Sequence, residues 1–474
     1  MAKTFAGARL RRLREERRLS QVELARLLEL SPSYLNQIEH DARPLTVPVL
    51  LRLTEAFGVD ASFFAARDTA RLTAELREAV VDEIEAGTVN ASEVADLAER
   101  MPGMARTLVE LRARLERLST GDGAQRSSTT GSAVGRGDDT VRDPTSHEQV
   151  RDFFYRHRNH IPALDEAAER LAGEIGVRAG ETRAALVRRL TERHGIRVQI
   201  GELGQELHRY DAERDVLRLA PHLRPGQRAF RVATVIAQLE FADLVEAEVA
   251  DAAELADADT RALARIGLAH YAAAALVLPY RAFHGTAERV GYDLERLADH
   301  FGVGFETVAH RCSTLQRPSL PGVPFAFVRV DRAGNMSKRQ SATAFHFSRA
   351  GGTCPLWNVY EAFASPGRVL TQIAEMPDGQ RYFWIARTVS RRRGGWHTPT
   401  KTFAVGLGCE LRHAERLVYS AGLDLADRSV VELIGSGCRT CERLECPQRA
   451  FPPLGRSLDV DPDRSTFAPY PVRP

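Results

Sequence analysis

The sequence predicts a multidomain protein in which an all-α helix-turn-helix head precedes a mainly helical α+β middle domain and an α+β C-terminal domain with an antiparallel sheet and a cysteine metal site. Three observations support this prediction. A helix, a tight turn and a second helix are encoded near the N-terminus, a stretch rich in Gly, Ser, Thr and Asp interrupts the chain at 119–146, and three cysteines cluster near the C-terminus. A length of 474 residues is also typical of about three domains.

Composition and charge narrow the class of protein. Hydrophobic residues make up 43% and charged residues 27% of the chain, as in soluble globular proteins. The net charge is +2, so affinity for nucleic acid has to come from local patches rather than from the whole chain. Because no apolar run is long enough to span a membrane and no hydrophobic signal segment follows Met1, we expect a cytoplasmic protein with no membrane partner.

The head is expected within residues 1–68 and centres on the segment from Gln21 to His40. Its first part has an apolar face at helical spacing, formed by Val22, Leu24, Ala25, Leu27 and Leu28. Ser31 is placed to cap the second helix, whose Leu35 and Ile38 point back to the core. The polar side chains left facing outward are Ser33, Tyr34, Asn36 and Gln37. A helix that reads the major groove of DNA displays polar side chains in this way.

This pattern resembles the Cro/repressor type of helix-turn-helix, in which Gln21 opens the first of the two helices and Arg43 and Pro44 follow the second. The resemblance implies that double-stranded operator DNA is a partner. The residues expected to contact it are Gln21, Ser31, Ser33, Tyr34, Asn36, Gln37 and Arg43. A small helical bundle that binds another protein is the alternative interpretation.

A helical connector is expected over 69–118. Its apolar residues Met104, Leu108, Leu111, Leu115 and Leu118 follow the spacing of a coiled-coil seam. The seam either packs against its own domain or pairs with a second copy of the chain. We favour a homodimer or higher homo-oligomer, because a single small helix-turn-helix unit rarely binds an operator tightly. Residues 119–146 have almost no apolar side chains and are expected to form a flexible linker.

The middle domain is expected over 147–316. A strand from Ile196 to Ile200 should pair with a second strand from Val216 to Leu219. Helical segments follow near 225–248, 260–278 and 281–290, and residues 293–315 have the pattern of another helix-turn-helix.

This order of strands and helices resembles the metallopeptidase-like domain of phage-immunity and radiation-response regulators. Active members carry an HExxH motif on the first of these helices, because two His four residues apart share one helical face and can bind zinc while the Glu acts as a base. The matching window here runs from Thr234 to Gln238 and has neither His nor Glu. The position of the third ligand is occupied by Leu268, and His270 nearby has no partner at ligand spacing. The protein is therefore not expected to be an enzyme.

The C-terminal domain is expected over 317–474. Strands are predicted at Phe325–Val330, Ala342–Phe347, Val369–Glu375, Tyr382–Thr388 and Thr402–Leu407, with a helix at Leu356–Ala364. Asp378 and Gly379 favour a hairpin turn between two of these strands. The result is an antiparallel sheet with few helices, a platform typical of small-molecule sensor domains.

Cys438, Cys441 and Cys446 point to a metal centre near the end of the chain. A CxxC pair lets two thiolates meet one centre through a tight turn, and Pro447 follows the third cysteine as a Pro follows a ligand in bacterial ferredoxin motifs. Cys409 is the favoured fourth ligand because it ends a predicted strand, and Cys354 and His413 are less favoured. The spacing alone leaves an iron–sulfur cluster and zinc as open alternatives.

The domain order, together with the segments GNMSKRQSATAFHFSR, GGTCPLWNVYEAF and GCRTCERLECPQRAFPP, resembles the short-chain fatty-acyl-responsive transcription regulators. The resemblance covers nearly the whole chain apart from the linker. It implies control of acetate, propionate and glyoxylate or methylcitrate metabolism genes, with CoA or acyl-CoA as the effector. It also implies a 4Fe-4S cluster on Cys438, Cys441 and Cys446, with Cys409 as the fourth ligand. The alternatives are an iron–sulfur redox sensor without a CoA ligand and a regulator stabilised by zinc.

An acyl-CoA ligand needs cations for its phosphates and an apolar or aromatic slot for its adenine and acyl groups. The candidates in the C-terminal domain are Lys338, Arg339, Arg391, Arg392, Arg393 and Trp396. These side chains could instead be solvated loops or contacts to DNA. A groove left by the vacant peptidase site in the middle domain is the alternative location for the ligand.

Overall fold

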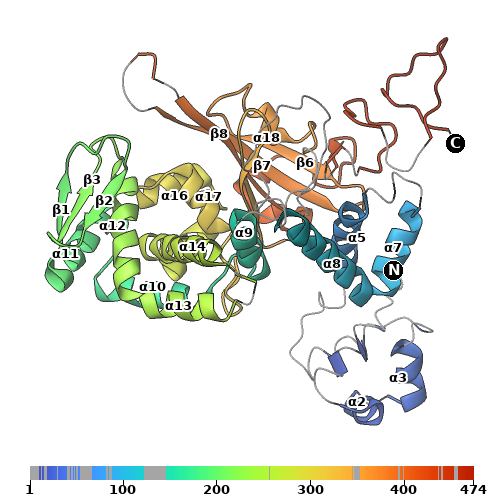
Figure 1. Cartoon of the computed structure of the whole chain (residues 1–474), viewed down its shortest axis with the longest axis horizontal. Coiled ribbons are helices and arrows are strands. Elements are labelled where there is room, and N and C mark those ends of the chain that lie inside the picture. Colours follow the sequence, from blue (N-terminus) through green and yellow to red (C-terminus); the bar gives the residue numbers. More distant parts are fainter. Residues whose placement is uncertain are drawn as a thin grey trace. The chain divides into compact units, whose positions relative to one another are not determined.

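The computed structural model of the chain divides into two compact units, one formed mainly by residues 1–115 and one by residues 116–474 apart from 454–457 (Figure 1). The structure describes most of the chain from Leu10 on. It leaves out 1–9, 12, 15–18, 29, 40–42, 44–45, 47, 50–51, 54–66, 82–83, 85–87, 122–145, 253, 256, 344, 346–352, 393–395, 399, 436, 439–440, 453–456 and 474. The predicted linker at 119–146 therefore lies almost entirely outside the described residues.

The first unit begins with the predicted pair of helices, α2 (Gln21–Leu27) and α3 (Pro32–Glu39). Leu24, Leu28, Leu35 and Ile38 are fully buried in a common core, as the apolar spacing predicted. Two residues of the predicted apolar face, Val22 and Leu27, are instead exposed. At about 100° of rotation per residue, both point well away from the direction shared by Leu24 and Leu28.

The longer helices that the structure describes in this unit are α5 (Arg67–Ala79), α7 (Ala91–Arg100) and α8 (Pro102–Gly121). Ala98 and Ala105 pack in their shared core. On α8, Met104, Leu108 and Leu111 are 54%, 38% and 52% exposed, so this stripe faces away from the helix's own bundle.

The second unit begins with the middle domain, whose helices are α9 (Ser146–Arg156), α10 (Pro162–Glu174), α11 (Thr182–His194), α12 (Pro225–Glu240), α13 (Ala242–Ala250), α14 (Ala258–Val277), α15 (Tyr280–Arg289), α16 (Leu294–Phe301) and α17 (Phe305–Cys312). Its small sheet has the order β1-β3-β2. The predicted pairing of β1 (Arg197–Ile200) with β3 (Val216–Leu219) is confirmed, and the pair is parallel. Sequence reasoning missed β2 (His208–Asp211), a half-buried strand without alternating hydrophobicity. The predicted helix at 225–248 is two helices separated at Phe241.

The C-terminal domain is a six-stranded sheet with the order β5-β4-β8-β7-β6-β9. Its strands are β4 (Ala326–Val330), β5 (Met336–Ser341), β6 (Leu370–Glu375), β7 (Arg381–Arg392), β8 (Thr400–Glu410) and β9 (Val431–Leu433). The Asp378–Gly379 hairpin is confirmed, since Gly379 adopts a φ of +79° between β6 and β7. The segment that pairs with β4 is Met336–Ser341, and residues 342, 343 and 345 of the strand predicted at 342–347 are not in a strand. Residues 344, 346 and 347 lie outside the described residues. The predicted helix at 356–364 is a single turn, α18 (Asn358–Glu361).

The two faces of this sheet have different neighbours. One face, including Phe383, Leu407 and Cys409, merges with the core of the middle domain, and Figure 1 shows the helices α9, α14 and α17 beside it. The other face is centred on Trp384, which packs on Gly408 so closely that a Cβ there would lie 2.5 Å from the indole ring. Within the described residues no single helix is long and apolar enough to cross a membrane, and only α14 and α15 taken together, with a bend of 62°, meet that test.

Candidate functional site

The helix-turn-helix is held together by polar contacts as well as by its core. Ser20 caps α2 in a reciprocal pair with Glu23, and the Ser31 hydroxyl accepts a hydrogen bond from the Tyr34 backbone N–H at 3.1 Å. The predicted capping role of Ser31 is therefore confirmed. The Glu39 carboxylate, which is buried, accepts hydrogen bonds from Arg14 at 2.7 Å and from Gln21 at 2.9 Å.

Four of the predicted DNA-contacting residues, Ser33, Tyr34, Asn36 and Gln37, are on α3. Ser33, Asn36 and Arg43 are exposed, and Tyr34 and Gln37 are half-buried. The Arg43 guanidinium stacks on the Tyr34 ring at 5.5 Å, so these two side chains support each other. Gln21 donates to Asn36 at 3.1 Å as well as to Glu39, which fixes α2 against α3 and sets the orientation of Asn36.

A pocket near the C-terminus gathers four of the six cysteines. Cys354, Cys438, Cys441 and Cys446 line it together with Leu433, Gly435, Gly437, Arg443 and Arg449. The pocket, including its open mouth, has a volume of about 280 Å³. Burial and the neighbouring Cys438 and Cys441 raise the pKa of the Cys354 thiol, although backbone N–H groups oppose the shift. Burial likewise raises the pKa of the Cys441 thiol, which lies beside Cys446.

Two arginines shape the loop that carries three of these thiols. The Arg449 side chain is buried and donates to the carbonyl oxygens of Cys438 at 3.2 Å and Cys441 at 2.6 Å. The Arg443 side chain donates to the carbonyl oxygens of Ile434 at 3.0 Å and Glu375 at 2.7 Å, which ties the loop to β6 and to the end of β9. A Cβ at Gly435 would lie 2.6 Å from the Cys441 sulfur, so only glycine leaves room for that sulfur.

The structure corrects the prediction of Cys409 as the fourth thiol. Cys409 is fully buried on the sheet face that packs against the middle domain, beside Leu407 and Phe383. Cys354 takes its place in the pocket. The sequence does contain a signal for it, because Pro355 follows Cys354 just as Pro447 follows Cys446. Among the described residues no three His, Cys, Asp or Glu side chains have the arrangement of a metal-ion site, so the argument for a metal centre depends on the shared pocket of thiols and not on ligand distances.

The predicted ligand-binding residues of the C-terminal domain are dispersed. Lys338 is half-buried on β5, whereas Arg339 is buried on the opposite face of the same strand. Arg391 forms an ion pair with Glu306 of α17, with 3.2 Å between the nitrogen and the oxygen. Trp396 is 83% exposed and does not form a slot with these cations. Arg393 and the side chain of Arg392 lie outside the described residues.

The helix that holds zinc in active members of the peptidase-like family is present without its ligands. Thr234 to Ala237 are buried in the core of α12, and Gln238 is exposed. Leu268 on α14 is fully buried. His270, two residues further on, lies 5.6 Å from the Phe230 ring, and burial together with Arg231, Lys338 and His208 lowers its pKa to about 4. His270 is therefore neutral at pH 7. Its neighbours Phe230 and Arg231 are not metal ligands, in agreement with the prediction that His270 has no ligand partner.

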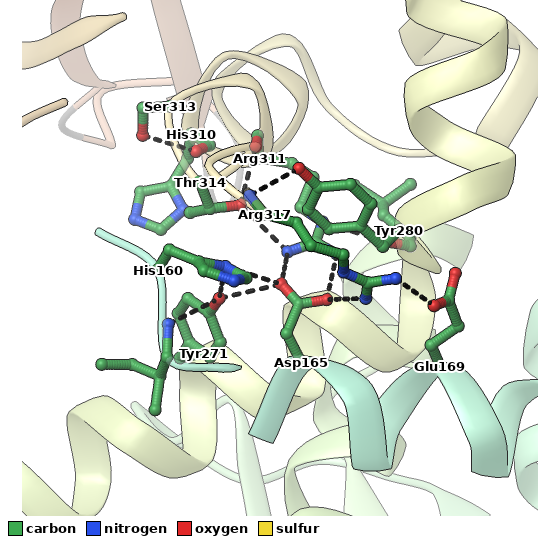
Figure 2. Close-up of polar contacts among 12 residues, drawn as sticks. His160, Asp165, Glu169, Tyr271, Tyr280, His310, Arg311, Ser313, Thr314 and Arg317 are labelled. Carbon is green, nitrogen blue, oxygen red and sulfur yellow. Dashed lines mark hydrogen bonds and ion pairs between the residues drawn. The ribbon is translucent and has the colours of Figure 1, made fainter. Parts of the chain in front are cut away.

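A buried ion-pair network lies in the middle domain and includes Arg317 in the connector that follows it (Figure 2). The Asp165 carboxylate of α10 accepts two hydrogen bonds from Arg311 of α17, at 2.8 and 3.0 Å, and one from the Tyr271 hydroxyl at 2.8 Å. Arg317, in the connector after α17, pairs with Glu169 at 2.7 Å and lies 4.1 Å from the centre of the Tyr280 ring. Sequence reasoning did not identify this network, because its members are spread over about 150 residues of chain, as the span from Asp165 to Arg311 shows.

Comparisons with known proteins identify all three domains. A helix-turn-helix domain matches residues 6–63, the IrrE N-terminal-like domain matches 191–313, and the C-terminal domain of the short-chain fatty acyl coenzyme A regulators matches 314–470. The HTH-type transcriptional regulator RamB of Mycobacterium tuberculosis is 55% identical over 100% of both chains. The propionyl-CoA carboxylase regulator of Cereibacter sphaeroides is 43% identical over 99% of both chains.

A solved structure agrees with these matches. The chain described as a Mycobacterium tuberculosis transcriptional regulator is 51% identical, with a TM-score of 0.67, and the match covers 69% of this chain and 100% of the solved one. These relatives are regulators, so the peptidase-like domain serves here within a DNA-binding protein. The full-length identity shows that the chain belongs to the short-chain fatty acyl coenzyme A regulator family of helix-turn-helix transcription regulators.

Proposed function

We propose that this transcription regulator senses CoA or short-chain acyl-CoA, carries a 4Fe-4S cluster in its thiol pocket and controls genes of short-chain fatty acid metabolism. The acids are acetate and propionate, and the pathways are the glyoxylate or methylcitrate routes. The observation that supports a cluster is the pocket lined by Cys354, Cys438, Cys441 and Cys446.

The donor set fits such a cluster. Four thiolates are the usual ligands of a 4Fe-4S centre, and three of these cysteines have the CxxC and Cys-Pro pattern of ferredoxins. The raised pKa of Cys354 and Cys441 means that both thiols are protonated when free, so metal binding has to displace their protons. Arg443 and Arg449 add positive charge beside a group of net negative charge. When bound, such a cluster would supply one-electron redox chemistry or sensitivity to oxygen.

Zinc is the second candidate for the same four thiols. Zinc prefers four ligands in a tetrahedron, and four thiols line this pocket. The two candidates differ in colour and in iron content, and each predicts loss of the metal when a ligand is replaced.

The matched relatives support the effector and the gene class. The family description refers to short-chain fatty acyl coenzyme A, and the Cereibacter relative is a regulator of propionyl-CoA carboxylase. A thioester ligand of this kind can change DNA binding only if it binds one conformation of the regulator more tightly than another. The exposed stripe of Met104, Leu108 and Leu111 on α8 is suited to pairing two chains, which would place two DNA-reading heads on one operator.

Anaerobic purification with absorption spectra and iron, sulfide and zinc analysis tests the metal centre. Wild-type protein should be brown and contain about four iron atoms per chain, as expected for this cluster type. Cys354→Ser should lose the colour and most of the iron. Cys409→Ser, the matched control, should keep both, because Cys409 lies on the other face of the sheet.

Three outcomes would contradict this assignment. Colourless protein with stoichiometric zinc would favour the zinc reading, and wild-type protein without metal would remove both readings. Loss of iron from Cys409→Ser together with retention of iron in Cys354→Ser would make Cys409 the fourth ligand, as the sequence predicted.

Calorimetric titration with CoA and propionyl-CoA tests the effector, and operator binding is then measured with and without each compound. The absence of both heat and any change in operator affinity would favour the redox-sensing alternative.

A further inference from the structure

The hairpin formed by β7 and β8 extends beyond the strands on either side of it. In the described part of the sheet, β6 pairs with β7 as far as Ala386, and β4 pairs with β8 as far as Ala404. The two strands continue to pair with each other at four further positions, from Val389–Phe403 to Arg392–Thr400. These four residue pairs, with Trp396 and His397 in the turn, are called the basic ribbon below. Figure 1 shows this end of the hairpin projecting from the sheet, in orange.

The basic ribbon carries positive charge and has no carboxylate of its own. From Gly379 to Cys409 the sequence contains six Arg or Lys residues and neither Asp nor Glu. Two of these cations, Arg391 and Lys401, are directly opposite each other in the ribbon, and both side chains are exposed. Like charges at directly opposed positions of two strands repel each other. An anion bound beside the pair would therefore relieve an unfavourable contact.

The surroundings of the ribbon neutralise only part of this charge. Arg391 forms its ion pair with Glu306 at 3.2 Å, but Glu306 also binds Arg329 at 2.7 Å. The Arg329 guanidinium and the Lys401 ammonium lie 4.6 and 5.3 Å from the centre of the same ring, that of Phe403. One carboxylate therefore serves three neighbouring cations. The Arg391 side chain remains 58% exposed, so a second anion can reach it.

The turn of the hairpin presents an aromatic side chain to the solvent. Trp396 is 83% exposed, and its ring centre lies 5.4 Å from that of His397. His397 has a φ of +68°, a left-handed conformation in which His is found more often than most residues with a side chain. The indole is thus not used for packing within the chain. An exposed Trp beside cations is suited to contact the sugars and base edges of a nucleic acid.

We propose that the basic ribbon is a second DNA-binding element, which contacts duplex DNA outside the bases read by the helix-turn-helix head. Arg391 and Lys401 would bind phosphate oxygens on one face of the ribbon, and the exposed hydroxyls of Ser390 and Thr400 are donors on the other face. Paired strands are about 4.8 Å apart, and a major groove about 12 Å wide admits a two-stranded ribbon. This inference does not depend on the effector or on the metal centre.

Duplex DNA fits the ribbon better than a membrane surface does. A hairpin that inserts into lipid needs several apolar side chains at its tip, whereas the described residues around Trp396 are His397, Thr398, Thr400 and Lys401. A helix-turn-helix domain is present in the same chain, so DNA is at high local concentration near the ribbon whenever the head is bound. A weak second contact then lengthens the stretch of DNA that one chain covers.

The salt dependence of DNA binding tests the phosphate contacts. The affinity of the full chain for a long duplex of random sequence is measured by fluorescence anisotropy between about 50 and 200 mM KCl. The test variant is Arg391→Gln with Lys401→Gln. The matched control is Arg209→Gln with Arg214→Gln, which removes the same charge from side chains that are 64% and 72% exposed.

Each phosphate contact contributes about 0.9 to the slope of log K against log salt, so the slope of the test variant should be shallower by about 1.8. Over this salt range the wild type should lose about tenfold more affinity than the test variant. The control should keep the slope of the wild type. The conservative pair Arg391→Lys and Lys401→Arg, which retains both charges, should do so too and would thereby exclude a folding defect.

Tryptophan fluorescence gives an independent readout at the tip of the ribbon. The chain contains three Trp residues, and Trp357 and Trp384 are 3% and 0% exposed. Quenching by acrylamide therefore reports mainly on Trp396. Saturating duplex DNA should protect the wild type from quenching, and Trp396→Phe should lose the quenchable signal with and without DNA.

Three results would overturn parts of this inference. Equal slopes in the test variant and the control would exclude the ribbon as a phosphate contact. A shallower slope without protection of Trp396 would keep the phosphate contact and exclude the indole from the interface. Protection of Trp396 by vesicles containing phosphatidylglycerol but not by DNA would assign the ribbon to a membrane surface instead.

Discussion

Replacing Asp165 with Ala is expected to lower the free energy of unfolding by about 3–5 kcal/mol, the usual result of removing one partner of a buried ion pair. The Asp165 and Arg311 side chains are 0% and 1% exposed, so water cannot replace the lost carboxylate. Three hydrogen bonds to Asp165 would disappear, two from Arg311 and one from Tyr271. Arg311 would keep its hydrogen bonds to the Leu278 carbonyl and to Thr314, which holds the loss below the simple sum of three charge-assisted bonds.

Thermal and urea unfolding of the full chain measure this loss. A change of 1 kcal/mol shifts Tm by roughly 2–4 °C in a cooperative unit of about 150–250 residues, so Tm should fall by roughly 6–20 °C. The control is Glu246→Ala, which removes an exposed pair with Arg265 and should cost about 0–1 kcal/mol. An equally small loss of stability in both variants would show that the buried Asp165 network does not stabilise the middle domain.

The pH dependence of this stabilisation has a definite sign. Burial alone would raise the pKa of Asp165, but Arg311, His160 and Tyr271 hold it well below its usual range. A carboxyl with a depressed pKa stabilises the fold above its ordinary pKa of about 3.9, and this contribution is lost as the pH falls further. The difference between wild type and Asp165→Ala should therefore be constant from about pH 7 to pH 5 and shrink in stronger acid.

Two more predictions concern function. Replacing Tyr34 and Gln37 with Ala should weaken operator binding in a mobility-shift assay while CoA and metal binding stay intact, and loss of all three would indicate unfolding instead. Leu111→Arg should lower the oligomeric mass measured by analytical ultracentrifugation, because it puts a charge on the exposed stripe of α8. An unchanged mass would show that this stripe does not pair two chains.

Local signals in the sequence predicted local structure well. The Ser31 cap, the burial of Leu35 and Ile38 and the hairpin at Asp378–Gly379 all depend on residues within about one turn of each other, where side-chain chemistry and backbone preference decide the outcome. The comparison with the HExxH motif is local in the same way, because all five positions of the motif fall on the single helix α12.

Long-range pairing accounts for the errors. Cys409 was misassigned because alternation along β8 puts it with Val405 and Leu407 on the face toward the middle domain, and the sequence does not tell which face the thiols cover. The strand β5 was missed because residues 336–341 are mostly polar, even though Arg339, Gln340 and Ser341 are buried, so their pairing with β4 shows no apolar alternation.

Helix α17 holds the middle domain and the C-terminal sheet together from both of its ends. Glu306, near its start, binds Arg329 of β4 and Arg391 of β7, and Arg311, five residues later, binds Asp165 of α10. The Arg311–Asp165 pair is buried, whereas the Arg329 and Arg391 side chains are 23% and 58% exposed. Exposed ion pairs contribute about 0–1 kcal/mol, so the contacts of Glu306 cannot compensate for the loss of Asp165.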